Sequence, residues 1–270
     1  MRQSPPLIVG NWKMNAGDLS AISLAKEIVI ATSKKNTVDV VVCPPLTVLA
    51  AVARAISSSG VFVGAQDCHV NKKGAHTGDV AAEMIAAAGA TYVIVGHSER
   101  RADHGETNQI IFAKTSAALR ADLTPIVCLG ETRAERDAGH AIAIVLSQLH
   151  ASLPKTSMAP ITAPITAQRV VVAYEPIWAI GTGSVATLQD IAEMHKNIRH
   201  ALVERFGATG RDIRILYGGS LKPDNAKDIL AVPHVNGGLI GGASLNAGSF
   251  AKIVMAAAAQ AGTSGTTCSL

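Results

Sequence analysis

A chain of 270 residues that is 48% hydrophobic, 16% charged and 3% aromatic has the composition of a globular protein, which excludes the collagen-like and disordered classes. The formal net charge is +4. The basic residues are scattered, with short pairs such as Lys34-Lys35, which disfavours a nucleic-acid-binding stripe. No run of about 18 apolar residues occurs, so no membrane span is expected.

Eight short apolar runs alternate with alanine-rich helical stretches such as Asp18–Ser33 and Glu106–Ala121. Most of the runs are continuous rather than alternating, which is typical of strands in a parallel sheet covered on its outer side. The expected strands, in chain order, are Leu7–Gly10, Val38–Cys43, Phe62–Ala65, Tyr92–Val95, Pro125–Leu129, Val170–Tyr174, Arg214–Tyr217 and Gly238–Ile240.

Eight βα units in a chain of this length predict the α/β class and a closed (β/α)8 barrel, the TIM barrel architecture, in a single domain over residues 1–270. An open doubly wound sheet usually has fewer strands and a glycine-rich fingerprint after the first; here Asn11–Asn15 follows instead. Residues 153–168 carry three prolines and are expected to form a surface insertion. Residues 262–270 are small and polar and are expected to fray.

The four cysteines, Cys43, Cys68, Cys128 and Cys268, show no CxxC spacing. They are expected to be free thiols in a reducing compartment. The first ten residues lack the apolar core of a signal peptide. We therefore expect a soluble cytoplasmic protein.

The stretch Val170–Gly183 carries the strongest chemical signal. A β-branched run ends at Tyr174 and delivers the carboxylate of Glu175, after which Pro176 ends the strand because proline has no N–H to donate. The apolar residues that follow end in a turn that begins at Gly181. An apolar loop beside an acid at a strand end predicts a lid that shields a reactive carboxylate from water.

Further polar and glycine residues follow other expected strands. In a barrel, residues just past the carboxyl ends of the strands line the active site. The first strand is followed by Asn11 and Lys13, and the fourth by His97. Glycine-rich turns, Gly218–Ser220 and Gly241–Gly242, follow the last two strands. Such turns can direct backbone N–H groups at a phosphate, and Gly181 in the lid could add another.

These side chains favour one class of reaction. Glu175 would remove a proton next to a carbonyl, while His97 and Lys13 stabilise the charge that develops on oxygen. No group of His, Asp and Glu has metal-ligand spacing in the sequence. We therefore expect base chemistry that needs no metal ion.

From Leu7 to about Ala259 the chain resembles the triosephosphate isomerase family. Six motifs match in order and at compatible spacing, which makes the resemblance very specific. They are Gly10–Asn15, Gly64–Gln66, Gly96–Arg101, Ala173–Gly183, Tyr217–Ser220 and Gly241–Leu245.

The resemblance implies a cofactor-free isomerase that interconverts dihydroxyacetone phosphate and D-glyceraldehyde 3-phosphate, in glycolysis, gluconeogenesis and the pentose shunt. It implies that Glu175 moves the proton between adjacent carbons of the triose phosphate. His97 would act as a neutral imidazole on the oxygens of the enediolate, because Ser98 could open a short helix whose dipole disfavours the charged form. Lys13 would supply positive charge, and Asn11 would help to hold the substrate.

The same resemblance assigns residues around this centre. Glu99 and Cys128 would support the pocket from behind, and the segment Pro176–Thr182 would close over the substrate. The phosphate would be bound by Gly181, Ser220, Gly241 and Gly242.

The resemblance also implies a homodimer, in which the loop Asn71–Asp79, with Thr77, enters the partner subunit and supports Asn11 and Lys13. The chain departs from the family pattern at four positions. His76 stands where an aromatic residue is frequent, and Asp79 where Glu is frequent. Asn236 and Gly238 replace an Asp and a Phe, and are expected to weaken packing at the eighth strand.

Three alternatives remain open from the sequence. A related isomerase for a four-carbon sugar phosphate could share the acid, the imidazole and the lysine. A barrel that serves only as a scaffold would be expected to lack at least one of Lys13, His97 and Glu175, and all three are present. A metal-dependent sugar-phosphate epimerase is disfavoured by the lack of a ligand cluster in the sequence.

Overall fold

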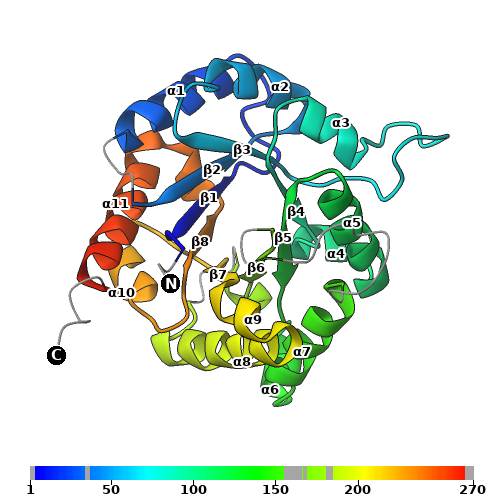
Figure 1. Ribbon diagram of the computed structural model, residues 1–270. Helices are drawn as coiled ribbons and strands as arrows, with labels where there is room; N and C mark the ends of the chain where they lie inside the picture. The colour runs from blue at the N-terminus through cyan, green and yellow to red at the C-terminus, as the bar shows by residue number, and fades with distance from the viewer. Residues whose placement is uncertain (1–3, 34–36, 155–165, 167–168, 181–184, 265–270) are drawn as a thin grey trace.

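Eight parallel strands close into a barrel in the computed structural model, which describes residues 4–33, 37–154, 166, 169–180 and 185–264 (Figure 1). Each strand pairs with the next in the sequence, and β8 pairs with β1. This closed order confirms the expected barrel. The strands are β1 Leu7–Asn11, β2 Asp39–Cys43, β3 Val61–Ala65, β4 Tyr92–Val95, β5 Thr124–Leu129, β6 Val171–Tyr174, β7 Arg214–Tyr217 and β8 Gly237–Ile240.

Helices connect the strands and form a ring around the barrel (Figure 1). Among the described residues no helix is both long and apolar enough to cross a membrane. The helices are α1 Ser20–Thr32, α2 Leu46–Ala55, α3 Ala82–Ala87, α4 Ser98–Asp103, α5 Asn108–Arg120, α6 Arg133–Asp137, α7 Ala141–Ser152, α8 Leu188–Phe206, α9 Ala208–Asp212, α10 Ala226–Leu230 and α11 Ala247–Ser264, with 3-10 turns η1 Ile177–Ala179 and η2 Gly242–Leu245.

All eight expected strands are confirmed, and α1 and α5 lie within the two helical stretches expected from the sequence. Helix α11 continues to Ser264, and the expected fraying of the tail from residue 262 stays a prediction. Most of the proposed insertion at 153–168 lies outside the described residues, as do 265–270.

Side chains along each strand alternate between two separate apolar clusters. Leu7 and Val9 of β1 belong to a cluster that draws on seven of the strands and fills the barrel. Ile8, between them, belongs to the larger cluster formed with the surrounding helices. This alternation follows from the period of two in a strand, and it produces one packed core inside the barrel and one around it.

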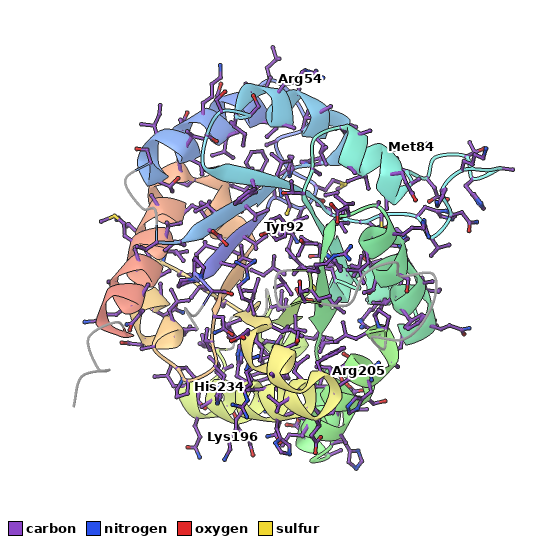
Figure 2. All side chains as sticks on the ribbon, in the orientation of Figure 1. Arg54, Met84, Tyr92, Lys196, Arg205 and His234 are labelled. Atoms are coloured by element: carbon purple, nitrogen blue, oxygen red, sulfur yellow. The ribbon has the colours of Figure 1, made fainter. Side chains whose placement is uncertain are left out.

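A buried arginine ties three strands together at the amino-terminal end of the barrel. Arg214, the first residue of β7, donates to Asp39 Oδ2 at 2.6 Å and to the Tyr92 hydroxyl at 3.2 Å. Asp39 and Tyr92 begin β2 and β4, and Figure 2 shows Tyr92 near the centre of the ring. This end of the barrel is therefore braced by a charge-assisted network, and the opposite end is left for chemistry.

Candidate active site

Glu175 and His97 meet at the carboxyl ends of the strands, as expected. His97 follows β4 and Glu175 follows β6. His97 Nε2 lies 3.0 Å from Glu175 Oε1, and the two residues are 6% and 2% exposed. An acid and an imidazole in direct contact and shielded from water form the centre of the site.

Glu175 is held by several contacts at once. The backbone N–H of Ser98 donates to Glu175 Oε2 at 3.0 Å. A Cβ on Gly218 would lie 2.8 Å from Glu175 Cγ, so glycine is required to leave room for the acid. Burial acts to raise the pKa of Glu175, but the charge and hydrogen bond of His97 and the Ser98 N–H outweigh it, and the pKa lies below its usual value.

His97 caps the amino terminus of α4, and this role fixes which ring nitrogen carries a proton. Its Nδ1 accepts from the backbone N–H of Glu99 at 3.2 Å. A nitrogen that accepts has no proton, so the neutral ring carries its proton on Nε2 and donates to Glu175. Burial acts to lower the pKa of His97, but the carboxylates of Glu175 and Glu99 raise it above its usual value.

Lys13 has a left-handed backbone, with φ at 52°, which is uncommon for a residue with a side chain and is typical of functional positions. Its N–H donates to Asn11 Oδ1 at 3.0 Å, and its carbonyl accepts from Gln66 Nε2 at 2.8 Å. The same Gln66 amide donates to the Cys43 carbonyl. Asn11 and Gln66 together therefore hold the lysine at the mouth of the barrel.

The side chain of Lys13 lies beside both the carboxylate of Glu99 and the glycine turn at Gly241. Its Nζ contacts Glu99 Oε1 at 2.5 Å. A Cβ on Gly241 would lie 3.4 Å from Lys13 Cε. Because Lys13 reaches both groups, it connects the carboxylate of Glu99, which contacts His97, to the turn expected to bind phosphate.

The two glycine turns lie on neighbouring strands. β7 and β8 pair through Tyr217 and Gly238, so Ser220 and the Gly241–Gly242 turn follow adjacent strand ends. Asn225 Nδ2 donates to the Ser220 carbonyl at 2.9 Å. The N–H and hydroxyl of Ser244 donate to the Gly241 carbonyl. Both turns are thus braced by polar contacts. Gly181, the expected lid contribution, lies outside the described residues.

A buried carboxylate anchors the described part of the lid. Glu131 Oε1 accepts from the Tyr174 hydroxyl at 3.0 Å and from Trp178 Nε1 at 2.8 Å. Arg136 lies 4.9 Å from the centre of the Trp178 ring and 3.5 Å from Glu131 Oε1. Burial raises the pKa of Glu131, and these donors reduce the effect. Trp178 of η1 is therefore fixed to the end of β5.

The three residues expected to have supporting roles differ in their placement. Glu99 contacts both Lys13 and His97. Cys128 is fully buried in the barrel core, and burial followed by the charge of Glu175 raises the pKa of its thiol. Thr77 is exposed on the loop before α3, and within the described part of one chain no hydrogen bond links it to the site.

Sequence reasoning assigned no role to three groups that the structure places at the site. They are the Gln66 side chain, the Ser98 backbone N–H and the Glu131 carboxylate. Gln66 and Ser98 fall within matched motifs, which was an available signal. Glu131 had none, because its partners lie 43 and 47 residues further along the chain.

One group of potential metal ligands, unexpected from sequence spacing, occurs away from the site. Ligand atoms of His69, His76 and Asp79 lie within 4.8 Å of one another. His69 Nδ1 accepts from the Asn71 N–H, and His76 Nε2 lies 2.8 Å from Asn71 Nδ2. Since ring nitrogens of both histidines already contact the protein, the geometry favours a hydrogen-bonded cluster.

Comparison with known proteins gives a consistent result. Residues 6–257 match the family model described as triosephosphate isomerase. A triosephosphate isomerase from Afipia carboxidovorans is 54% identical over 256 residues, covering 93% of this chain and 97% of the relative. One from Hyphomonas neptunium is 50% identical over 252 residues, covering 93% and 98%.

A solved structure shows the same likeness in three dimensions. The crystal structure of triosephosphate isomerase from Bartonella henselae superposes with a TM-score of 0.85 at 39% identity, covering 93% of this chain and 98% of that one. The family match, the relatives and the shared barrel agree over nearly the same residues. The chain therefore belongs to the triosephosphate isomerase family.

Proposed function

We propose that Glu175, His97 and Lys13 carry out the proton transfers of this isomerase. The reaction, which follows from family membership, interconverts dihydroxyacetone phosphate and D-glyceraldehyde 3-phosphate. The observation that carries the assignment is the 3.0 Å contact between the buried carboxylate of Glu175 and His97 Nε2. This contact places a base and a proton donor side by side, so that a substrate that replaces the contact meets both groups.

Glu175 becomes a stronger base when the substrate enters. In the structure its two oxygens are occupied by His97 and by the Ser98 N–H. A substrate that takes these donors for its own oxygens leaves Glu175 under the influence of burial, which raises its pKa. The carboxylate then removes the proton from one carbon and returns it to the next.

His97 acts as a neutral acid on the substrate oxygens. Because Nδ1 accepts from Glu99, the mobile proton is on Nε2, the nitrogen that faces Glu175. When Glu175 turns towards the substrate, the main contribution that raises the pKa of His97 weakens. The imidazole then donates to the enediolate oxygens without becoming a buried cation.

Lys13 and the glycine turns bind the phosphate and stabilise the enediolate. The ammonium extends from a backbone fixed by Asn11 and Gln66. The backbone N–H groups of Ser220, Gly241 and Gly242 are proposed to bind the phosphate oxygens, with Gly181 from the lid. Closure of Pro176–Thr182 on the Glu131 anchor would exclude water from the reactive intermediate.

The dimer is part of this proposal. The loop Asn71–Asp79 projects well beyond the barrel wall between β3 and α3 (Figure 1), and most of it is exposed. Met14, beside Lys13, is 96% exposed. Burial of the Met14 side chain against a second subunit would remove its apolar surface from water. We assign this loop and Met14 to a homodimer interface.

We also propose a single domain over residues 1–270 and a cytoplasmic location. The barrel and its ring of helices share one continuous outer core, which supports the single domain. Cys43, Cys68 and Cys128 are buried free thiols, as expected in a reducing compartment.

A substrate panel tests the reaction. Purified protein is assayed in a chelator with D-glyceraldehyde 3-phosphate and with a four-carbon aldose phosphate. The proposal predicts fast turnover of the triose and at least about a hundredfold lower kcat/KM for the longer sugar, because one extra carbon displaces either the phosphate or the carbonyl. A folded dimer that is inactive on the triose, or that prefers the four-carbon sugar, would contradict it.

A further inference from the structure

A second polar cavity opens at the amino-terminal end of the barrel. Its volume is about 530 Å³, and its lining includes Arg199, Arg211, His234 and Asn236. Asn236 directly precedes β8, and Arg211 lies in α9, just before β7. Glu175 and His97 instead follow the carboxyl ends of their strands. The cavity and the active site therefore lie at opposite ends of the barrel.

Arg199 is a buried cation that forms no salt bridge with a carboxylate in the described part of the chain. It is 8% exposed, and its guanidinium donates to the Gly210 carbonyl at 2.5 Å and to Asn236 Oδ1 at 2.8 Å. The Asn236 oxygen also accepts from the Ile215 N–H at 3.0 Å. Within the described chain, no carboxylate lies within 4.0 Å of Arg199. Both acceptors are neutral, whereas a buried charge is usually paired with an opposite one.

The surroundings of Arg199 are positive. Burial, together with the charges of Arg199 and Lys196, lowers the pKa of His234, and Figure 2 shows His234 and Lys196 close together. Burial lowers the pKa of Arg199 to about 10, and Asp212 offsets this only in part. Arg211 lies exposed at the rim. A positive field that is only partly compensated attracts anions.

We propose that this cavity binds a small oxyanion, one that carries a phosphate or carboxylate group. Arg199 supplies the counter-ion at the base, and Arg211 and His234 contact the anion at the rim. Two of the five guanidinium N–H groups of Arg199 make the hydrogen bonds above, which leaves donors for a fork-like contact with an oxyanion. The volume suits a small metabolite. The proposal does not depend on the isomerase reaction.

The Asn236→Asp variant provides a direct test because it places a carboxylate on the position that already contacts Arg199. The chain then supplies its own anion, with almost no change in size. Inorganic phosphate is titrated calorimetrically into the full-length protein and into this variant. The catalytic turns are themselves proposed to bind phosphate, so both titrations contain that contribution and their difference reports the cavity.

We expect the unaltered chain to bind two equivalents of phosphate per subunit, and Asn236→Asp to bind the second at least tenfold more weakly with kcat/KM unchanged. Ser58→Asp, which adds the same charge at an exposed position, should retain both equivalents. Arg211→Gln, at the exposed rim, should weaken the second about threefold.

The same titrations are repeated with malonate, a dicarboxylate, to distinguish a carboxylate ligand from a phosphate ligand. A second equivalent of either anion that Asn236→Asp removes supports the proposal. A single equivalent of both anions in every chain, or a second one that Asn236→Asp leaves unchanged, overturns it.

Discussion

The protonation of His97 depends on a single backbone contact. The Glu99 N–H donates to its Nδ1, so its Nε2 holds the proton that faces Glu175. The side-chain amide of a glutamine can donate a hydrogen bond from the same place, but it cannot give up a proton and take it back. Gln at this position therefore separates hydrogen bonding from proton transfer.

His97→Gln is predicted to lower kcat by a factor of about 10² to 10⁴, the usual contribution of a general acid, while KM changes only a few-fold. His200→Gln is the matched control, because His200 is exposed on α8. Steady-state kinetics with D-glyceraldehyde 3-phosphate measure both variants. A His97→Gln enzyme with a kcat near that of the control would show that His97 does not transfer a proton.

The positions of Lys13, His97 and Glu175 could be predicted because each follows a strand end, and strand ends are visible in the sequence. Gln66 and Ser98 could not be assigned in the same way. Gln66 acts on Lys13 from 53 positions away, and the Ser98 N–H acts on Glu175 across 77 positions. Such contacts depend on barrel closure and register, which a local pattern does not encode.

At the scale of elements, most strands were predictable because a short continuous run of β-branched residues is compatible with few structures other than a buried strand. β8 was a weaker case, since Gly237 and Gly238 have low strand propensity. The prediction that Gly238 weakens packing at β8 is not tested directly. A Cβ on Gly238 would lie 2.4 Å from Leu221 Cδ2, so the Leu221 side chain already occupies the space beside it.

Helix α8 carries a buried neutral histidine that makes stability depend on pH. His195 is 0% exposed, its Nδ1 donates to the His234 carbonyl, and it packs edge-on against Tyr174. Burial lowers the pKa of His195 to about 4, from 6.5. The unfolded chain binds this proton first, so stability is complete above about pH 6.5 and falls as the pH drops towards 4.

This shift predicts that the titration of His195 lowers the free energy of unfolding by about 3 kcal/mol between pH 7 and pH 4, at about 1.36 kcal/mol per pKa unit. His195→Gln keeps a donor for the His234 carbonyl and should flatten this part of the pH dependence, whereas the exposed control His200→Gln should not. Urea unfolding at several pH values measures the free energy of unfolding of each variant. Equal slopes for both variants would contradict the assignment.

At the scale of the whole molecule, the loop proposed to form the dimer interface is the feature that one chain explains least. The loop Asn71–Asp79 extends from the barrel, and Thr77 within it is exposed. The sequence could indicate the loop through its resemblance to the family. In the proposed homodimer each chain carries both the loop and the surface that receives the partner's loop, and the two meet only between subunits.

Thr77→Arg is predicted to produce a monomer, because a cation on this loop cannot be buried in a partner without a counter-charge. Activity should fall at least about a hundredfold, since Asn11 and Lys13 lose the support of the partner loop. Ser58→Arg, exposed and remote from this loop, is the control. Size-exclusion chromatography with light scattering measures the mass. A fully active dimer of Thr77→Arg would rule out this interface.

The central claim is that Glu175 is the base, and the most direct measurement compares kcat/KM of Glu175→Gln and Glu193→Gln on D-glyceraldehyde 3-phosphate. Glu193 is exposed on α8, so the same change there is a matched control. The account predicts that Glu175→Gln folds, binds the substrate and loses at least about 10³-fold in kcat/KM, while the control is unchanged. A folded Glu175→Gln enzyme with activity within tenfold of the control would contradict it.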